Sequence, residues 1–302
     1  MSSRSVSNHS FARAVWAAHS LIRDPRLSFP PRQSRPAPCL SIRFDGRARL
    51  FGRRIAGQPK RLLPSPQRRG TDTAWFLFRS PESSLPERRS PLYWPRERAL
   101  LVADLHLEKG SWYARHGALL PPYDSRETLE RLADAVKATG ARRVITLGDN
   151  FHDDSGTQRL DPYAAGMLEA LTRALDWVWI TGNHDAGQSR AFGAELVEEM
   201  EVSGIVLRHE AKPGETRAEL SGHFHPKMRM KVRERHIARA CGVVGRSGTT
   251  QRMILPAFGA YTGGMDAGAP EILAALSPAR EVDAVMAARD KLVRFPLWRE
   301  AA

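Results

Sequence analysis

Short apolar segments, each closed by polar residues or glycine, recur along the chain after about residue 75. They contain three to five residues and are rich in β-branched and aromatic side chains, which is typical of buried strands. The pattern therefore predicts five strands, at 99–103, 144–147, 177–180, 204–207 and 253–255.

Amphipathic helical patterns separate the first three of these segments. The apolar residues of 129–136 recur at helical spacing, and the pair Asp124 and Glu127 ahead of them resembles a capping box. A second helix is predicted with Asp161 as its N-cap and Pro162 as its first residue. Strands that alternate with helices in this way indicate an α/β core with parallel strands.

Polar residues that can bind metal ions follow the predicted strands. The candidate ligands are Asp104, His106, Asp149, Asn183, His209, His223 and His225. Open α/β sheets place their ligand sites at the carboxyl ends of strands, so we expect these side chains to lie close together.

Two pairs of candidate ligands, Asp104 with His106 and His223 with His225, are separated by a single residue. In an extended segment such residues point to the same face, so Asp104 and His106 are expected to reach one metal together, and His223 and His225 to repeat this arrangement. Carboxylate oxygen, amide oxygen and imidazole together suit Mn, Fe or Zn.

Seven candidate ligands are too many for one ion and suit two ions about 3.5–4 Å apart, the separation found in two-metal hydrolases. One carboxylate must then bridge the ions. A water held between them becomes hydroxide near neutral pH and attacks phosphorus in line. We therefore predict two divalent ions, with Mn²⁺ the expected metal and Fe or Zn the alternatives.

The order of these motifs, D-x-H, G-D, G-N-H-D, H and G-H-x-H, resembles the calcineurin-like metallophosphoesterase superfamily, with every ligand position filled. The resemblance implies a four-layer α/β sandwich in which two mixed β-sheets are flanked by helices. It also implies one ion held by Asp104, His106 and His225, a second held by Asn183, His209 and His223, and a bridge at Asp149.

The resemblance further implies roles for residues that are not ligands. His184 would protonate the leaving oxygen, and Asp185 would keep it in place. His152 lies three residues after the bridging Asp149, where nuclease members that repair double-strand breaks also carry a histidine. An imidazole at this position would steady the scissile phosphate.

A narrower resemblance, over about Pro91 to Phe295, is to the DNA-ligase-associated metallophosphoesterases, the PdeM family of DNA-damage-response endonucleases. It is carried by the segments 104–111, 120–124, 148–153, 222–227 and 256–264. It implies an endonuclease that hydrolyses phosphodiester bonds of DNA in the DNA damage response. An ATP-dependent DNA ligase, a helicase and an exonuclease of the same pathway are the implied partners.

Three further residues are candidate substrate contacts. Lys109 and Lys227 lie within three residues of candidate ligands, so their ammonium groups could meet a phosphate oxygen. Tyr261, between Gly259 and Gly263, could stack or form a hydrogen bond near the site. The alternatives are a solvated position for the lysines and a packing role for the tyrosine.

The formal net charge of +13 is distributed unevenly. Residues 1–70 hold fifteen basic and two acidic residues, whereas residues 71–302 hold 31 of each. We predict that 1–70 is a disordered Arg/Ser/Pro-rich extension and that 71–302 is the catalytic domain. The alternatives for the extension are an organelle transit peptide, a start codon that lies downstream and a basic arm for DNA.

No apolar run approaches the ~18 residues that a membrane span needs, and Cys39 and Cys241 have no partner spacing. A soluble, cytoplasmic protein is therefore predicted. Two functions compete with DNA cleavage: hydrolysis of a small nucleotide or another small phosphoester, and a catalytically idle scaffold in a repair assembly. The complete ligand set argues against the scaffold.

Overall fold

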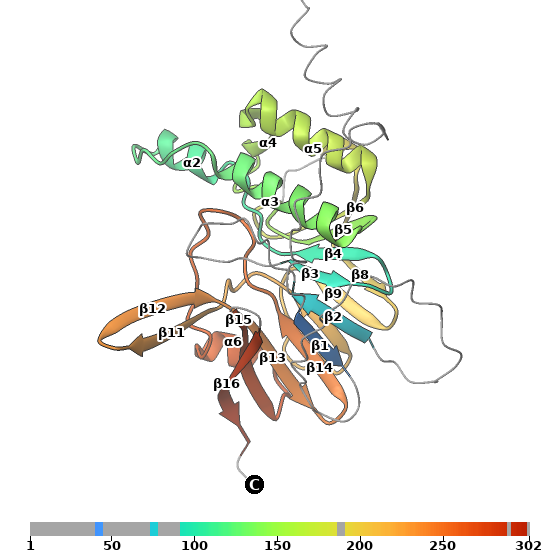
Figure 1. Cartoon of the computed structure of the whole chain (residues 1–302), viewed down its shortest axis with the longest axis vertical. Coiled ribbons are helices and arrows are strands. Elements are labelled where there is room, and N and C mark those ends of the chain that lie inside the picture. The colour runs from blue at the N-terminus through green and yellow to red at the C-terminus, as the bar shows by residue number, and fades with distance from the viewer. Residues whose placement is uncertain (1–39, 45–72, 78–90, 186–190, 289–290, 301–302) are drawn as a thin grey trace, which may run out of the picture. The chain divides into compact units, whose positions relative to one another are not determined.

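The computed structural model describes residues 40–44, 73–77, 91–185, 191–288 and 291–300 (Figure 1). All of them belong to one unit, Ala37–Ala302. Strand β1 (Leu40–Phe44) falls within the segment that we predicted to be unfolded, and it pairs with β2 (Thr73–Leu77). The rest of the 1–70 segment lies outside the described residues.

The first sheet has seven strands in sequence order, β1 to β7. Its other strands are β3 (Leu92–Trp94), β4 (Ala99–Val102), β5 (Arg143–Leu147), β6 (Asp176–Ile180) and β7 (Glu195–Val197). Strands β4 to β7 pair in parallel, and β1 to β4 pair antiparallel. The predicted parallel core of three strands is therefore confirmed.

Helices connect the parallel strands of this sheet. They are α2 (Lys109–Arg115), α3 (Asp124–Thr139), α4 (Gly156–Arg159) and α5 (Pro162–Ala174), and a 3₁₀ turn η1 (Ala191–Gly193) precedes β7. Asp161 caps α5 as predicted, because its carboxylate accepts the N–H groups of Tyr163 and Ala164.

The predicted capping box of α3 is wrong. Tyr123 occupies the N-cap position, and Asp124 lies inside the helix. The Asp124 carboxylate accepts the backbone N–H of Gly110 at 3.0 Å, so it ties α2 to α3 instead of capping its own helix. A tertiary contact has replaced the local one that the sequence pattern favours.

The second sheet also has seven strands, in the order β16-β15-β13-β14-β10-β9-β8. They are β8 (Glu199–Val202), β9 (Ile205–Arg208), β10 (Ala218–Ser221), β13 (Gly242–Ser247), β14 (Thr250–Ile254), β15 (Glu281–Ala288) and β16 (Lys291–Arg299). Strands β9, β10 and β14 pair in parallel, and the other pairs are antiparallel. A separate hairpin, β11 (Lys227–Val232) and β12 (Arg235–Ala240), precedes β13, and α6 (Pro270–Ala275) precedes β15.

The two sheets face each other across a shared apolar core. Leu101 and Ile145 of the first sheet and Leu207 and Val244 of the second lie in one buried cluster. Because side chains alternate along a strand, Leu100 points to the opposite face, where it meets α3 and α5. Helix α6 packs in the same way on the outer face of the second sheet. The predicted fold class, two mixed sheets flanked by helices, is therefore confirmed.

None of the helices in the described part of the chain is long and apolar enough to cross a lipid bilayer.

Candidate functional site

All seven candidate ligands lie in loops that follow the carboxyl ends of strands. The first sheet supplies Asp104, His106, Asp149 and Asn183, and the second sheet supplies His209, His223 and His225. The loops are joined directly, since the N–H of His106 donates to the carbonyl of Asp149 and the N–H of His223 donates to the Asp104 carboxylate. The sheets thus bring these segments to one place, as expected for parallel strands.

The first group of ligand atoms consists of Asp104, His106, Asp149 and His225, whose nearest atoms all lie within 4.8 Å of one another. The Nε2 atoms of His106 and His225 are 3.3 Å apart. Asp149 Oδ2 lies 3.5 Å from His106 Nε2, and Asp104 Oδ1 lies 3.6 Å from His225 Nε2. Both carboxylates are buried.

The second group consists of Asn183, His209 and His223, with Asp149 beside them. Asn183 Oδ1, His209 Nε2 and His223 Nδ1 form a triangle with sides of 3.0, 3.0 and 3.1 Å. Asp149 Oδ1 lies 3.4 Å from His209 Nε2. Asp149 therefore turns one oxygen toward each group, which is the arrangement that a bridging ligand requires.

The second group brings an imidazole nitrogen against an amide oxygen. His209 Nδ1 lies 3.0 Å from the carbonyl of Leu147, so in the neutral ring Nδ1 donates to that carbonyl and Nε2 carries the lone pair. This lone pair lies 3.0 Å from Asn183 Oδ1, which is also an acceptor. Two ligands at right angles around an ion, each about 2.1 Å from it, are themselves about 3.0 Å apart. The donor set and its spacing therefore fit a divalent cation.

Burial lowers the pKa of two imidazoles among the candidate ligands. Burial first, and the neighbouring His225 second, lower the pKa of His106 far below its ordinary value. Burial and then His209 lower the pKa of His223 in the same way. A neutral imidazole has a free lone pair, which is the form that binds a metal ion.

The backbone of the ligand loops is left-handed, not extended as we predicted. The φ angles are 54° at Asp104, 42° at His106, 49° at Asp149, 72° at His223 and 47° at His225. Asp104 and His106 still reach the same group, with Leu105 buried between them. His223 and His225 do not repeat that arrangement, because they point into different groups. The predicted extended backbone is therefore wrong for both pairs. The prediction that both residues of a pair reach the same group is wrong for His223 and His225.

His184 lies beside the first group. Its ring Nδ1 lies 2.9 Å from the carbonyl of His152, to which it donates, and its backbone N–H donates to Asp149 Oδ1. Its Nε2 lies 4.0 Å from Asp149 Oδ2, and its side chain is 38% exposed. The outward nitrogen is thus fixed in orientation and accessible to a substrate.

Asp185 acts on the backbone of the loop that carries His184. Its buried carboxylate accepts the backbone N–H groups of Gly182, Asn150 and Phe151 and the side-chain amide of Asn150. These bonds join the loop after β5 to the loop after β6. Asp185 therefore positions His184 through the backbone, because it fixes the loop that carries it.

His152 lies at the edge of the first group. Its Nδ1 is 3.3 Å from Nδ1 of His106, and its ring stacks on that of His184 with centroids 5.2 Å apart. Burial, followed by the charge of Lys109, lowers the pKa of His152 to about 4. If Nε2 of His106 holds a metal, its Nδ1–H donates to His152, which leaves the proton of neutral His152 on Nε2.

The candidate substrate contacts lie at different positions. Lys109 begins α2, and its charge acts on both His106 and His152. Lys227 begins β11, where its side chain passes so close to Gly264 that a Cβ there would lie 2.7 Å away. The hydroxyl of Tyr261 donates to the carbonyl of Pro121 at 2.7 Å. Lys109 therefore lies within electrostatic reach of the ligands.

Sequence reasoning missed two aromatic residues next to His152. The ring of Trp112 meets that of His152 edge-on with centroids 4.8 Å apart, and Tyr113 lies nearly parallel to it at 6.5 Å. Both belong to α2, which begins three residues after His106. An aromatic pair one helical turn beyond a ligand motif is the signal that would have drawn attention to them.

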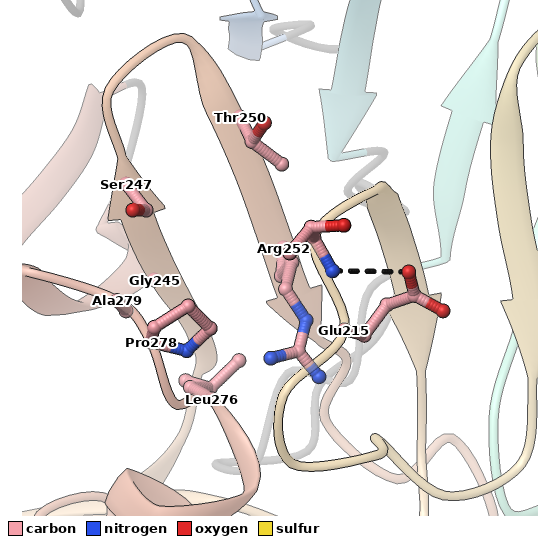
Figure 2. Close-up of a pocket in the computed structure, with 9 residues that line it drawn as sticks. Glu215, Gly245, Ser247, Thr250, Arg252, Leu276, Pro278 and Ala279 are labelled. Carbon is pink, nitrogen blue, oxygen red and sulfur yellow. Dashed lines mark hydrogen bonds between the residues drawn. The ribbon is translucent and has the colours of Figure 1, made fainter.

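A pocket elsewhere in the second sheet does not coincide with this site. It has about 110 Å³ of space for water and lies among β13, β14 and the loops around Glu215 and Pro278 (Figure 2). Arg252 lines it, but its guanidinium is already used by Glu219 and by the carbonyls of Lys212, Ala275 and Ser277. The pocket offers no group with ligand chemistry comparable to that of the histidine–aspartate site.

Comparison with known proteins gives one family and one informative structure. A family model described as calcineurin-like phosphoesterase matches residues 97–227. The nuclease MPE of Pseudomonas putida is 28% identical, with a TM-score of 0.50, and the match covers 73% of this chain and 100% of that chain. The curated proteins contain no match to the chain. The superfamily resemblance drawn from the motifs is confirmed.

Two other solved structures are more distant. Vacuolar Protein Sorting 29 from Cryptosporidium parvum is 16% identical, with a TM-score of 0.29, over 66% of this chain and 95% of that chain. A predicted phosphoesterase from Streptococcus pneumoniae TIGR4 is 12% identical, with a TM-score of 0.27, over 66% of this chain and 96% of that chain. Scores this low identify no shared function.

Proposed function

Residues 97–227 belong to the calcineurin-like phosphoesterases, which makes the chain a metal-dependent hydrolase, and from this premise we propose that it is a two-metal nuclease that hydrolyses phosphodiester bonds of DNA. The observation that carries the two-metal part is the position of Asp149. Its two carboxylate oxygens face two separate groups of acceptor atoms, 3.5 Å from His106 and 3.4 Å from His209.

The proposed ligand assignment follows these two groups. Asp104, His106 and His225 would hold one ion, Asn183, His209 and His223 the other, and Asp149 both. Carboxylate, amide and imidazole ligands suit Mn²⁺, with Fe and Zn as alternatives. When bound, the two ions supply an activated water and offset the negative charge of the phosphate.

The protein's own groups would manage the proton and the substrate. His184 is held at Nδ1 by the carbonyl of His152, so a proton on its Nε2 can pass to the leaving oxygen. Neutral His152 would direct its Nε2–H at a phosphate oxygen. Lys109, which already acts electrostatically on both His106 and His152, would offset phosphate charge on the same side.

The similarity to a nuclease over its whole length supports a nucleic acid as the substrate, and DNA is proposed from the sequence resemblance. The role in DNA damage, the ligase, helicase and exonuclease partners and the cytoplasmic location are further parts of the proposal, and they rest on the sequence resemblance alone.

A panel of hydrolysis assays with Mn²⁺ tests the proposal. Plasmid DNA, single-stranded DNA, a cyclic nucleotide and a chromogenic phosphate bis-ester would be compared on one preparation, with metal content measured alongside. We expect about two metal equivalents per chain and cleavage of DNA. Turnover of the cyclic nucleotide with intact DNA would show that the substrate is a small phosphoester. Full activity at one metal equivalent would contradict the two-ion site.

A further inference from the structure

The hairpin of β11 and β12 (Figure 1), residues Lys227–Ala240, concentrates positive charge. It holds six lysine or arginine residues and one glutamate, whereas residues 71–302 as a whole hold 31 basic and 31 acidic residues. We call residues 227–240 the basic hairpin.

The basic hairpin is fixed beside the metal ligands. Strand β11 begins two residues after His225. Its base is held by hydrogen bonds from the N–H of Lys227 to the carbonyl of Met265 and from the N–H of Ala267 to the carbonyl of Lys227, 2.8 and 2.9 Å long. On the return strand, the N–H of Cys241 donates to Pro226. A polymer that binds the hairpin therefore also approaches the site.

The register of the hairpin separates an apolar face from a basic face. Met228 and Met230 are partly buried against the cluster around α6. Arg229 and Lys231 alternate with them along β11, so they point to the opposite side, and Lys231 lies opposite His236. Their side chains are 60% and 53% exposed.

The charges on this face are available to a polyanion. Arg229 lies 3.8 Å from Asp266, and Lys231 lies 2.6 Å from Glu234. Ion pairs this exposed contribute little to stability, so a phosphate can displace either carboxylate. Arg233 and Arg235 at the turn are also exposed, but Arg235 pairs with Val232 and so lies on the face of Met228 and Met230.

We propose that the basic hairpin binds the sugar–phosphate backbone of DNA and guides it to the metal site, an inference that rests on the proposed nuclease function. Cations two residues apart on one strand face are about 6.6 Å apart. Arg229 and Lys231 can therefore contact different phosphates of one DNA strand. A membrane partner would need apolar side chains at the tip, but residues 233–236 are Arg, Glu, Arg and His.

The test is a charge-neutralised variant in the full chain: Arg229→Gln, Lys231→Gln, Arg233→Gln and Arg235→Gln together. Labelled single-stranded and duplex oligonucleotides would be titrated in EDTA over a range of salt. We expect Kd to rise roughly tenfold or more at low salt, and the slope of log K against log salt to fall by up to about 3 for single strands. The preferred substrate is whichever oligonucleotide, single-stranded or duplex, binds the wild-type protein more tightly.

A matched control removes the same charge elsewhere: Arg126→Gln, Lys137→Gln, Arg142→Gln and Arg173→Gln, all exposed positions on or beside α3 and α5. The control should bind DNA as wild type does, and both variants should hydrolyse the chromogenic bis-ester at the wild-type rate. An unchanged Kd and salt slope in the hairpin variant, an equal loss in the control, or no DNA binding by wild type would each overturn the inference. Failure of the proposed function is a separate result, namely no phosphoester hydrolysis by wild type with Mn²⁺.

Discussion

Two polar clusters in this molecule are built in opposite ways. The ligand cluster consists of seven side chains, Asp149 among them, and its facing atoms are oxygens and imidazole nitrogens. The arginine–glutamate network consists of Arg208, Glu215, Glu219 and Arg252, where guanidinium groups face carboxylates.

The charges of the arginine–glutamate network are paired within the protein, although Nε of Arg208 forms no hydrogen bond. Nε of Arg252 donates to Glu219 at 2.7 Å, and its other nitrogens donate to three backbone carbonyls. Nη2 of Arg208 donates to Glu215 at 2.9 Å. Arg208, Glu219 and Arg252 are each at most 3% exposed. Buried charges paired in this way need no further partner.

The comparison shows how burial can serve either stability or binding. In the network, protein donors offset the cost of burying charge. In the ligand cluster, carboxylate, amide and imidazole groups face one another in a set that fits a divalent cation. Variants in each cluster should therefore affect different properties: metal content and hydrolysis for the ligand cluster, and stability for the arginine–glutamate network.

The largest effect is expected for Asp149→Ala. It removes one carboxylate oxygen from each of the two ligand groups, so both metal content and hydrolysis should fall to background. If the ligand cluster is unfavourable without metal, the variant should also unfold in EDTA at no lower temperature than wild type in EDTA. Mass spectrometry and thermal unfolding measure both quantities. Retention of two metals would show that Asp149 is no bridge.

His184→Ala should keep both metals and lose roughly 10²–10⁴ in turnover of DNA, because a general acid contributes about that factor. The loss should be smaller for a nitrophenyl ester, whose leaving group needs no proton. Metal content and both rates, measured on one preparation, check this. An emptied metal site, or equal losses on both substrates, would place His184 among the ligands or the phosphate contacts instead.

Glu219→Gln should lower the free energy of unfolding by roughly 3–5 kcal/mol, because it leaves buried arginine charge without its partner. Metal content should not change. The matched control is Glu201→Gln, which breaks an ion pair with Arg217 whose side chains are 53% and 51% exposed and should cost under about 1 kcal/mol. Denaturant titration measures both. A metal loss in Glu219→Gln would mean that the two clusters are not independent.

Asp283→Asn is expected to have the smallest effect, and one that depends on pH. Burial alone would raise the pKa of Asp283, but hydrogen bonds from Arg246 and Arg299 lower it below its ordinary value. A lowered folded-state pKa contributes stability above the unfolded value of about 3.9 and loses it as the pH falls through the folded value. At pH 7 the variant should therefore have a lower free energy of unfolding than wild type, measured by denaturant titration. At pH 3 this difference should be smaller. A constant gap would contradict the pairing.

The sequence predicted the parallel core and the convergence of the ligand motifs because both depend on local patterns. Apolar runs at 144–147 and 177–180 mark strands, and parallel strands necessarily bring their carboxyl ends to one edge. The start of α5 was predictable for the same reason, since Asp161 and Pro162 act on their own helix.

What the sequence did not predict depends on contacts between distant segments. Asp124 binds Gly110 instead of capping its own helix, and Asp185 binds the loop after β5. Gly259 shows the same limit, because a Cβ there would lie 1.9 Å from the carbonyl oxygen of Leu105, more than 150 residues away. No pattern within a short window carries such information. The left-handed φ angles of five ligand residues are a further feature that the sequence did not predict.

The left-handed ligand residues restrict which metals the site could be redesigned to hold. Aspartate and histidine are among the few residues other than glycine that adopt this backbone region readily, so at five positions conformation and ligand chemistry require the same residue types. A cysteine introduced to favour a thiolate-binding metal would take on a left-handed backbone at a cost of about 1–2 kcal/mol per position. Asn183 and His209 lie outside this set of five, and because Asn183 is exposed whereas His209 is buried, exchange of the donor atom meets the least resistance from the fold at Asn183.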